Sequence, residues 1–254
     1  MQDSDSAMTF RYDIFRTAQT AQWMGHPLYV FETLTSTSSQ LWQQLGEGAQ
    51  PGTAVLALQQ EAGRGQWGRT WCSPLGGLYL SVAIAPNIAA DESAQLTVCS
   101  ALGIAKALRE QQIPVGLKWP NDLLLHGKKL GGILTETTIQ QGRIDRAVIG
   151  IGINWRNPVP AEGIALQGDN REPNPPALSS LEKLTALILQ GVEIGYEQWQ
   201  KTGIEGILPD YLGLLRAVNS DQAIAPLSRT LTLQFDTPVD ASADLLPQNG
   251  QCSP

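Results

Sequence analysis

The sequence contains few of the residues from which disulfide frameworks and metal clusters are built. Its three cysteines, Cys72, Cys99 and Cys252, lie far apart, and its two histidines, His26 and His126, share no ligand spacing with them. Disulfide-rich domains and zinc sites need closely and regularly spaced ligands. We therefore expect neither, and we predict that the thiols are buried or idle.

Basic charge and long apolar runs are also scarce. The 17 lysines and arginines are outnumbered by 24 aspartates and glutamates, which gives a net charge of −7. Broad nucleic-acid binding usually requires a basic face and is excluded, whereas a local basic pocket is not. No apolar run approaches the roughly 18 residues that cross a bilayer, and Asp3 and Asp5 stand where a signal peptide would be basic and then apolar. We predict a cytoplasmic protein that binds no membrane.

What is present is an alternation of strand and helix patterns without a fixed repeat. The chain has 254 residues, 42% of them hydrophobic, enough to bury a large core. The patterns predict strands at 28–31, 53–58, 78–85, 115–119 and 123–125, and two further apolar segments at 130–138 and 146–153. They predict helices at 40–45, 93–110, 178–200 and 204–216.

The second half of the chain has fewer strand signals. Residues 156–177 hold five prolines and predict a long, mobile loop, and one more strand is expected at 230–235. The fold class is therefore α+β, with most of a mixed β-sheet before residue 155 and helices after it.

The most informative segment is a glycine-rich loop at residues 63–73, Gly-Arg-Gly-Gln-Trp-Gly-Arg-Thr-Trp-Cys-Ser. Glycines allow a backbone to curl around an anion, and guanidinium groups and indole rings suit the phosphates and base of a nucleotide. The glycine spacing matches a dinucleotide-binding loop, but Pro74, Gly76 and Gly77 leave no room for the helix that this fold requires. A Walker A loop is excluded too, because Lys128 is followed by Lys129 instead of Ser or Thr. The loop is expected to fold over an anionic ligand, with a structural hairpin as the alternative.

A second segment, Lys118-Trp119-Pro120-Asn121-Asp122, combines a basic residue with two short polar side chains. The chain has only six lysines, and three of them fall at positions 118, 128 and 129, which indicates a positively charged pocket. Amide and carboxylate oxygens are suitable ligands for Mg²⁺. Taken alone, Asn-Asp after Pro is more often a plain turn.

Three further segments suit a ligand, and two of them have a second interpretation. Glycines follow Lys129 at 131–132, which would let a ligand lie close against the backbone. Glycines alternate with isoleucines at 149–153, so one face of that strand is bare. A flat, apolar ligand or another closely packed strand would both suit that face. The hydroxyls of residues 36–39 suit a polar head group, or a helix cap.

Together and in this order, the segments resemble those of the biotin protein ligases, over about residues 28–155. The motifs that carry the resemblance are Gly-Arg-Gly-x-x-Gly-Arg-x-Trp, Lys-Trp-Pro-Asn-Asp, Lys-Leu-x-Gly-Ile-Leu-x-Glu and Gly-Ile-Gly-Ile-Asn. The resemblance implies a catalytic domain of the biotin/lipoate ligase type, similar to class II aminoacyl synthetases, at 28–216. An N-terminal extension at 1–27 would precede it, and an abbreviated or divergent C-terminal β segment at 217–254 would follow.

The resemblance also implies an activity. Biotin and ATP, with Mg²⁺, would be joined into biotinyl-5'-AMP, and biotin would then pass to a lysine of the biotin carboxyl carrier protein of acetyl-CoA carboxylase. Fewer than thirty residues precede the first strand, too few for the helix-turn-helix domain of bifunctional members, so we expect a monofunctional type that binds no DNA. A homodimer is compatible with the resemblance.

The family's functional residues map onto matching positions of this sequence. Biotin contacts fall at Ser36, Thr37, Ser38, Gln60, Gly63, Arg64, Gly65, Gln66, Lys129, Gly132, Gly150 and Gly152. ATP contacts fall at Arg69, Trp71, which would stack on adenine, Asn121, Lys129 and Asn154. The catalytic set is Arg64, Lys118, Asp122 and Lys129, in which Asp122 would also hold Mg²⁺ and help to deprotonate the acceptor amine.

Two other functions stay open. A lipoate- or octanoate-activating ligase of the same superfamily would need a more linear and apolar pocket. A non-catalytic biotin- or nucleotide-binding module would be expected to lack Arg64 or Lys129, and both are present.

The sequence departs from the family at two positions. Ser38 replaces the usual asparagine, and Gln66 stands where many members have a second arginine. We expect Gln66→Arg to slow the release of the adenylate, because an added guanidinium would help to retain the intermediate. A single-turnover assay that follows free adenylate measures this, and an unchanged release rate would contradict the expectation.

Overall fold

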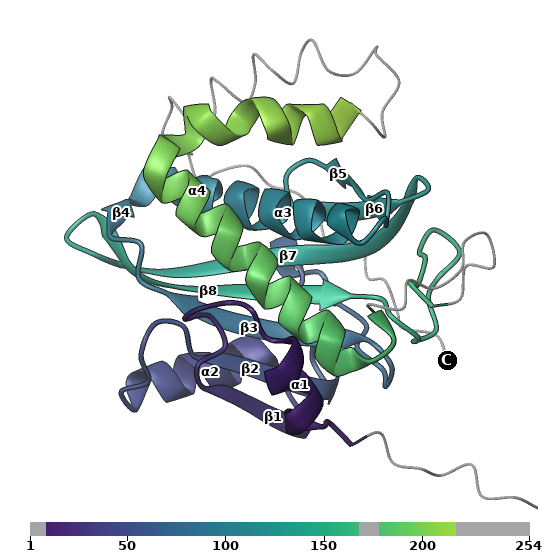
Figure 1. Ribbon diagram of the computed structural model, residues 1–254. Helices are drawn as coiled ribbons and strands as arrows, with labels where there is room; N and C mark the ends of the chain where they lie inside the picture. The colour runs from purple at the N-terminus through teal and green to yellow at the C-terminus, as the bar shows by residue number, and fades with distance from the viewer. Residues whose placement is uncertain (1–8, 168–177, 217–254) are drawn as a thin grey trace, which may run out of the picture.

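One mixed β-sheet organises the described part of the chain, residues 9–167 and 178–216 of a computed structural model (Figure 1). The sheet has eight strands in the order β1-β2-β3-β8-β7-β6-β5, with β4 paired to β8. β1 and β2 are parallel, and the other pairs are antiparallel. The strands are β1 Leu28–Leu34, β2 Ala54–Gln60, β3 Leu78–Ile84, β4 Ile88–Ala89, β5 Gly116–Lys118, β6 Asp122–Leu125, β7 Lys128–Gln140 and β8 Arg143–Ile153.

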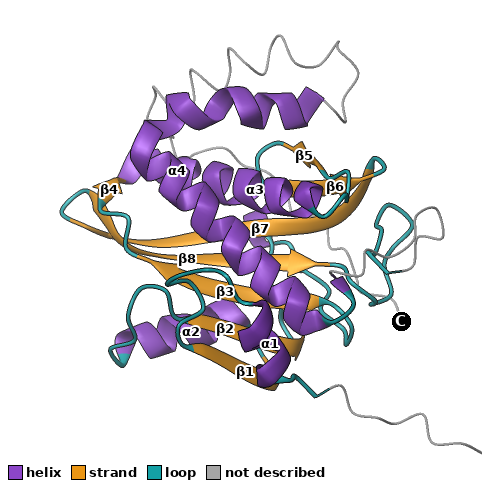
Figure 2. Ribbon diagram, in the orientation of Figure 1, coloured by secondary structure: helices purple, strands orange, loops and turns teal. Residues whose placement is uncertain are grey.

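Helices cover both faces of the sheet (Figure 2). α3 (Ser93–Glu110) and α4 (Leu181–Arg216) pack on one face, and α2 (Thr37–Gly46) packs on the other through Leu41 and Leu45. A short helix, α1 (Tyr12–Ala18), contacts α4. The predicted α+β class and the mixed sheet before residue 155 are confirmed.

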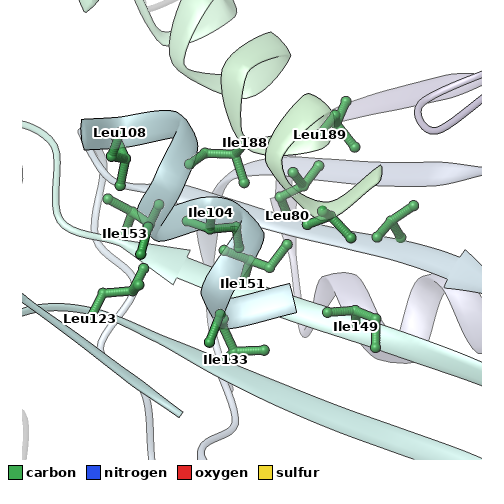
Figure 3. Close-up of a cluster of buried hydrophobic side chains, with 14 of the residues drawn as sticks. Leu80, Ile104, Leu108, Leu123, Ile133, Ile149, Ile151, Ile153, Ile188 and Leu189 are labelled. Carbon is green, nitrogen blue, oxygen red and sulfur yellow. The ribbon is translucent and has the colours of Figure 1, made fainter. Parts of the chain in front are cut away.

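The main core lies between the sheet and the pair α3 and α4, where the last part of β8 places isoleucines at 149, 151 and 153. Figure 3 shows this cluster, with Ile149, Ile151 and Ile153 of β8, Ile104 and Leu108 of α3, and Ile188 and Leu189 of α4 among the labelled residues. The two helices approach closely because glycines face each other: a Cβ on Gly103 would lie 2.0 Å from the carbonyl oxygen of Gly191. The sequence patterns did not predict this crossing.

The two predicted C-terminal helices are one element with a break. Gly203 has φ 68° and ψ −175°, a conformation that suits glycine, and it divides α4 near the predicted boundary. Figure 1 shows the last part of α4 turning away from the long first part and running above α3. None of the helices in the described ranges is long and apolar enough to cross a membrane.

Two of the predictions need correction. Residues 156–167 are not loose, because Lys129 of β7 exchanges backbone hydrogen bonds with Glu162 and Ile164, each of 3.0 Å. Cys99 is buried and free, and burial raises the pKa of its thiol to about 12, whereas Cys72 is disulfide-bonded and is therefore not idle. Cys252, the strand expected at 230–235 and the segment 217–254 lie outside the described residues.

Residues 9–27, from the predicted N-terminal extension, join the core through buried carboxylates. Glu193 of α4 is 5% exposed and accepts hydrogen bonds from the backbone N–H groups of Gln22 (2.6 Å), Trp23 (2.8 Å) and Met24 (3.2 Å). Glu182 accepts another from the N–H of Arg11, at 2.8 Å. A carboxylate that receives several backbone N–H groups ties two segments together strongly.

We expect Glu193→Gln to lower the free energy of unfolding by about 2 kcal/mol, because an amide accepts with one oxygen and turns its own N–H₂ toward the remaining donors. Urea denaturation measures the change. Glu197→Gln, on the same helix, is the control, since Glu197 forms a surface pair with Lys201 and its loss should cost less than about 1 kcal/mol. Equal losses in the two variants would contradict this account of Glu193.

Candidate functional site

A cavity of about 330 Å³ opens on the face of the sheet that carries α2. It gathers residues from all five segments that the sequence singled out, which lie up to about a hundred residues apart along the chain. Its lining is Ser36, Thr37, Ser38, Gln60, Arg64, Gly65, Gln66, Trp67, Arg69, Thr70, Trp71, Lys118, Trp119, Pro120, Asn121, Asp122, Lys129, Gly132, Ile133, Leu134, Gly150, Ile151 and Gly152.

The floor of the cavity is the glycine-bearing side of β7 and β8. Gly132 of β7 lies directly opposite Gly152 of β8, and Leu134 lies opposite Gly150. The prediction of a strand face without side chains is confirmed. At Gly152 this face is covered by Trp71 of the glycine loop and not by another strand. There a Cβ would lie 2.4 Å from Nε1 of Trp71, so the missing side chain makes room for the indole ring.

Lys129 lies between an acid and an aromatic ring. Its Nζ is 2.7 Å from Oδ1 of Asp122 and 5.4 Å from the centroid of a ring of Trp71. The ring face and the carboxylate both attract the ammonium group electrostatically and so fix its position. The indole N–H of Trp71 is buried against Gly152 and has no hydrogen-bond partner among the described residues.

A network of hydroxyl and amide groups forms the end of the cavity at the start of α2. Oγ1 of Thr37 and Oγ of Ser38 both contact Oγ of Ser81, at 2.8 and 3.0 Å. Oε1 of Gln60 accepts the backbone N–H of Thr37 at 2.8 Å, and its Nε2 donates to Oγ of Ser73 at 2.8 Å. This end of the cavity is therefore uncharged and rich in hydrogen-bonding groups.

The sequence prediction of this network was incomplete. The helix begins at Thr37 instead of Gln40, and Ser36 at its N-cap makes no side-chain capping bond, so capping does not explain the hydroxyls. Ser81 was missed, although a single hydroxyl within the buried strand at 78–84 was a usable signal. Ser73 was quoted as the end of the glycine loop but was given no role.

The glycine loop follows β2 and includes a single 3-10 turn at Gln66–Gly68, so the absence of a Rossmann helix is confirmed. Two backbone hydrogen bonds close it: Gly65 N–H to Arg69 O (2.7 Å) and Trp71 N–H to Gly63 O (2.9 Å). Its tip is Trp67, which is 84% exposed and has φ 59°, uncommon for an aromatic residue.

Arg64 of this loop is paired with an acid that sequence reasoning did not assign a role. Its Nη2 is 2.8 Å from Oε2 of Glu136 on β7, and the indole N–H of Trp42 donates to the same oxygen at 3.2 Å. Glu136 is the last residue of the Lys-Leu-x-Gly-Ile-Leu-x-Glu motif, so the sequence motif already included this glutamate. The motif did not indicate that Glu136 pairs with Arg64.

Asn121 and Asp122 enter the cavity from the start of β6. The side-chain amide of Asn121 donates to the carbonyl of Ile133 at 2.9 Å, and the N–H of Ile133 donates back to the carbonyl of Asn121 at 3.0 Å. Asp122 lies opposite Gly132 in the β6–β7 register. Lys118, at the end of β5, is exposed at the rim.

Two predicted site residues do not line the cavity. Gly63 lies behind the loop, where a Cβ would be 2.4 Å from the carbonyl oxygen of Trp71. Asn154 is buried, and its side-chain amide donates to the carbonyl of Lys129 at 3.4 Å while its Oδ1 accepts from Asn157 at 3.0 Å. Both residues support the strands and the loop that carry the lining.

The charge of the cavity is opposite to that of the chain. Four cations, Arg64, Arg69, Lys118 and Lys129, line it together with one carboxylate, Asp122, in a protein of net charge −7. No group of three or more His, Cys, Asp or Glu residues within the described ranges could hold a metal by itself. Asp122 and Asn121 nevertheless suit Mg²⁺, which takes one or two protein oxygens and fills its shell with phosphate and water. The site is built for a ligand with several negative charges beside a neutral polar group.

Comparisons with known proteins identify the family. The model of the "Biotin/lipoate A/B protein ligase family" matches residues 30–154. The chain is 30% identical over 239 residues to the bifunctional ligase/repressor BirA of Escherichia coli, an alignment that covers 91% of this chain and 72% of that protein. With BirA of Bacillus subtilis it is 38% identical over 133 residues, which is 52% of this chain and 41% of the relative's length.

Solved structures agree with these matches. The biotin protein ligase from Aquifex aeolicus in complex with biotin and ATP has a TM-score of 0.61 and 26% identity, over 74% of this chain and 78% of that one. The enzyme from Leishmania major in complex with biotinyl-5-AMP has a TM-score of 0.60 and 25% identity, over 74% and 81% of the two chains. The chain belongs to the biotin/lipoate A/B protein ligase family, and these relatives are biotin protein ligases.

The fit of Trp71 against β8 makes a prediction about the two floor glycines. We expect Gly152→Ala to lower the free energy of unfolding by about 2 kcal/mol, because the new methyl group would overlap the indole ring. Gly132→Ala is the matched control on the opposing strand. Its methyl group would be 3.5 Å from Trp71, an ordinary contact, so we expect a change below about 1 kcal/mol. Urea denaturation of both variants measures the difference, and equal stabilities would show that Trp71 does not rest on Gly152.

Proposed function

We propose that this protein activates biotin with ATP as biotinyl-5'-AMP and transfers the biotinyl group to a lysine of the biotin carboxyl carrier protein of acetyl-CoA carboxylase. The observation that carries the proposal is the division of one cavity into an uncharged hydrogen-bonding end and a cationic end. Biotin has a polar, neutral ring system and a chain that ends in a carboxylate. The relatives named as biotin ligases, and the solved complexes with biotin, ATP and biotinyl-5-AMP, support the same assignment.

Biotin would lie along the cavity with its ring system at the start of α2. The hydroxyls of Thr37, Ser38 and Ser81 and the amide of Gln60 already form one network, so they offer fixed donors and acceptors to the ring's polar atoms. The aliphatic chain of biotin would then cross the sheet beside Gly150, and the carboxylate at its end would reach Lys129. Trp71 over Gly152 would form a wall of the apolar section.

The first step requires one anion to attack another. A carboxylate oxygen of biotin would form a bond to the α-phosphorus of ATP as the bond to pyrophosphate breaks, which adds charge to the non-bridging oxygens. Lys129 is suited to contact both anions, and Arg64 and Arg69 would neutralise the growing charge. Arg64 would exchange its pairing with Glu136 for the substrate. A bound Mg²⁺ would supply further neutralisation at the phosphates, held by Asp122 and Asn121.

The second step breaks the new anhydride at its acyl carbon. The ε-amine of the carrier lysine would attack that carbon, and AMP would leave with the oxygen that came from the carboxylate. The amine must lose a proton, and Asp122 is the acid–base group of the cavity that is suited to accept it. The glycine loop, with the exposed Trp67 at its tip, would cover the adenylate and exclude water.

A lipoate- or octanoate-activating enzyme is the competing function, and pyrophosphate release separates the two. We expect release when the protein is incubated with ATP, Mg²⁺ and biotin, and much less with lipoate, because the hydrogen-bonding groups at the start of α2 would be left unpaired by an apolar chain. No release with biotin would contradict the proposed function, and release with neither acid would favour a non-catalytic binding module.

Lys129 provides the sharper test, because the neighbouring lysine is a natural control. We expect Lys129→Ala to lower the rate of adenylate formation about a hundredfold or more, since it removes the cation that meets both reacting anions. Lys128→Ala, one residue earlier at the exposed start of β7, should change the rate less than about twofold, because a surface charge outside the cavity contributes little. Rates that fall equally in both variants would argue against the assigned role of Lys129, and thermal unfolding checks that both are folded.

A further inference from the structure

A tyrosine from the end of the chain's last described helix reaches the segment that carries Asn121 and Asp122. The hydroxyl of Tyr211 donates a hydrogen bond of 2.9 Å to the carbonyl of Pro120. Its ring also meets the indole of Trp119 edge to face, with centroids 6.1 Å apart and planes at 86°. Residues 118–122 all line the cavity, whereas Tyr211 does not, so its contact is with the back of this segment.

The break in α4 allows this contact. Gly203 turns the chain so that the part of α4 after it packs against β5, the strand that leads into the segment. An ion pair of 2.5 Å between Lys106 of α3 and Asp210 secures this part of the helix. Tyr211, the next residue, is fully buried.

The hydroxyl of Tyr211 is well suited to act as a permanent donor. Burial, and then the negative charge of Asp122, raise the pKa of Tyr211, so the phenol keeps its proton at all physiological pH values. A buried hydroxyl without a partner is costly, and the Pro120 carbonyl is the partner that the fold offers.

The segment is thus clamped between two elements. On the cavity side, Asn121 and Ile133 exchange two hydrogen bonds, which tie it to β7. On the opposite side, Tyr211 holds the carbonyl of the preceding residue. A shift of the peptide at Pro120 would move Asn121 and Asp122 directly, because they follow it in sequence.

We propose that Tyr211 is a positioning residue for the nucleotide end of the cavity, which fixes Asn121 and Asp122 for the activation step without touching either substrate. This role rests on the proposed function. The groups suited to biotin's ring come from α2, β2 and β3, and none of them contacts Tyr211 through a hydrogen bond in the described structure. Loss of the hydroxyl should therefore affect the chemical step and spare biotin affinity.

Tyr211→Phe tests the role, because it keeps the ring against Trp119 and removes only the hydroxyl. We expect kcat for biotin-dependent pyrophosphate release to fall about tenfold, as for a small misplacement of reacting groups, with the Kd for biotin unchanged within about twofold. Hydrogen exchange at the backbone amide of Ile133, which donates to Asn121, should become about tenfold faster, because its partner is less firmly held. Exchange at the amide of Thr37, in the uncharged end, should not change.

Tyr196→Phe is the control variant. Tyr196 lies on the same helix before the break and is also buried, but its ring neighbours are Trp23 and Trp199, remote from the segment. We expect it to leave kcat and Ile133 exchange unchanged. If Tyr211→Phe behaves like this control, or weakens biotin binding as much as it lowers kcat, the positioning role is overturned.

Failure of the proposed function gives a different result. If the unaltered protein releases no pyrophosphate with biotin, the biotin ligase assignment is wrong, and the exchange rate at Ile133 still decides whether Tyr211 holds the segment. Faster exchange in Tyr211→Phe alone would keep the positioning role, and equal exchange in both variants would remove it.

Discussion

The alternation of isoleucine and glycine at residues 149–153 of β8 is the constraint on which the rest of the structure depends. Ile149, Ile151 and Ile153 face α3 and α4 and bury the main core, while Gly150 and Gly152 leave the other side of the same strand without side chains. Because successive residues of a strand point to opposite faces, one short sequence supplies both the core and the cavity floor. A large side chain in place of Gly150 or Gly152 would fill the cavity. A small side chain in place of one of the isoleucines would weaken the packing of the sheet against α3 and α4.

The cavity concentrates positive charge that the whole chain lacks. Two of its four cations are restrained by an anionic or aromatic neighbour: Lys129 by Asp122 and Trp71, and Arg64 by Glu136. Such pairs keep the side chains ordered without a ligand, and partial exposure keeps each pair weak enough to be exchanged for a substrate. Pre-ordered cations are the most effective way to bring a carboxylate to a phosphate, since little reorganisation remains at the moment of reaction.

Sequence patterns predicted most of the sheet and the segments of the site, and they failed where partners are distant in the sequence. The strands of the sheet except β4, together with α3 and the division of the C-terminal helix near residue 203, follow from periodicity. The pairing of Arg64 with Glu136, the hydrogen bond of Ser81 with Thr37 and the contact of Tyr211 with Pro120 could not be predicted, because each joins residues more than about forty positions apart. Asn154 was assigned to the nucleotide by motif alone, and the structure puts it behind Lys129 as a support.

The central claim is that a carboxylate oxygen attacks the α-phosphorus of ATP in this cavity, and the fate of that oxygen tests it most directly. The measurement is mass spectrometry of the AMP formed from ATP, Mg²⁺ and biotin labelled with ¹⁸O in its carboxylate, with hydroxylamine as the acyl acceptor. The account predicts that each AMP carries one ¹⁸O atom, because the bond formed to phosphorus survives when the acyl carbon is attacked. AMP that forms without the label would contradict the account.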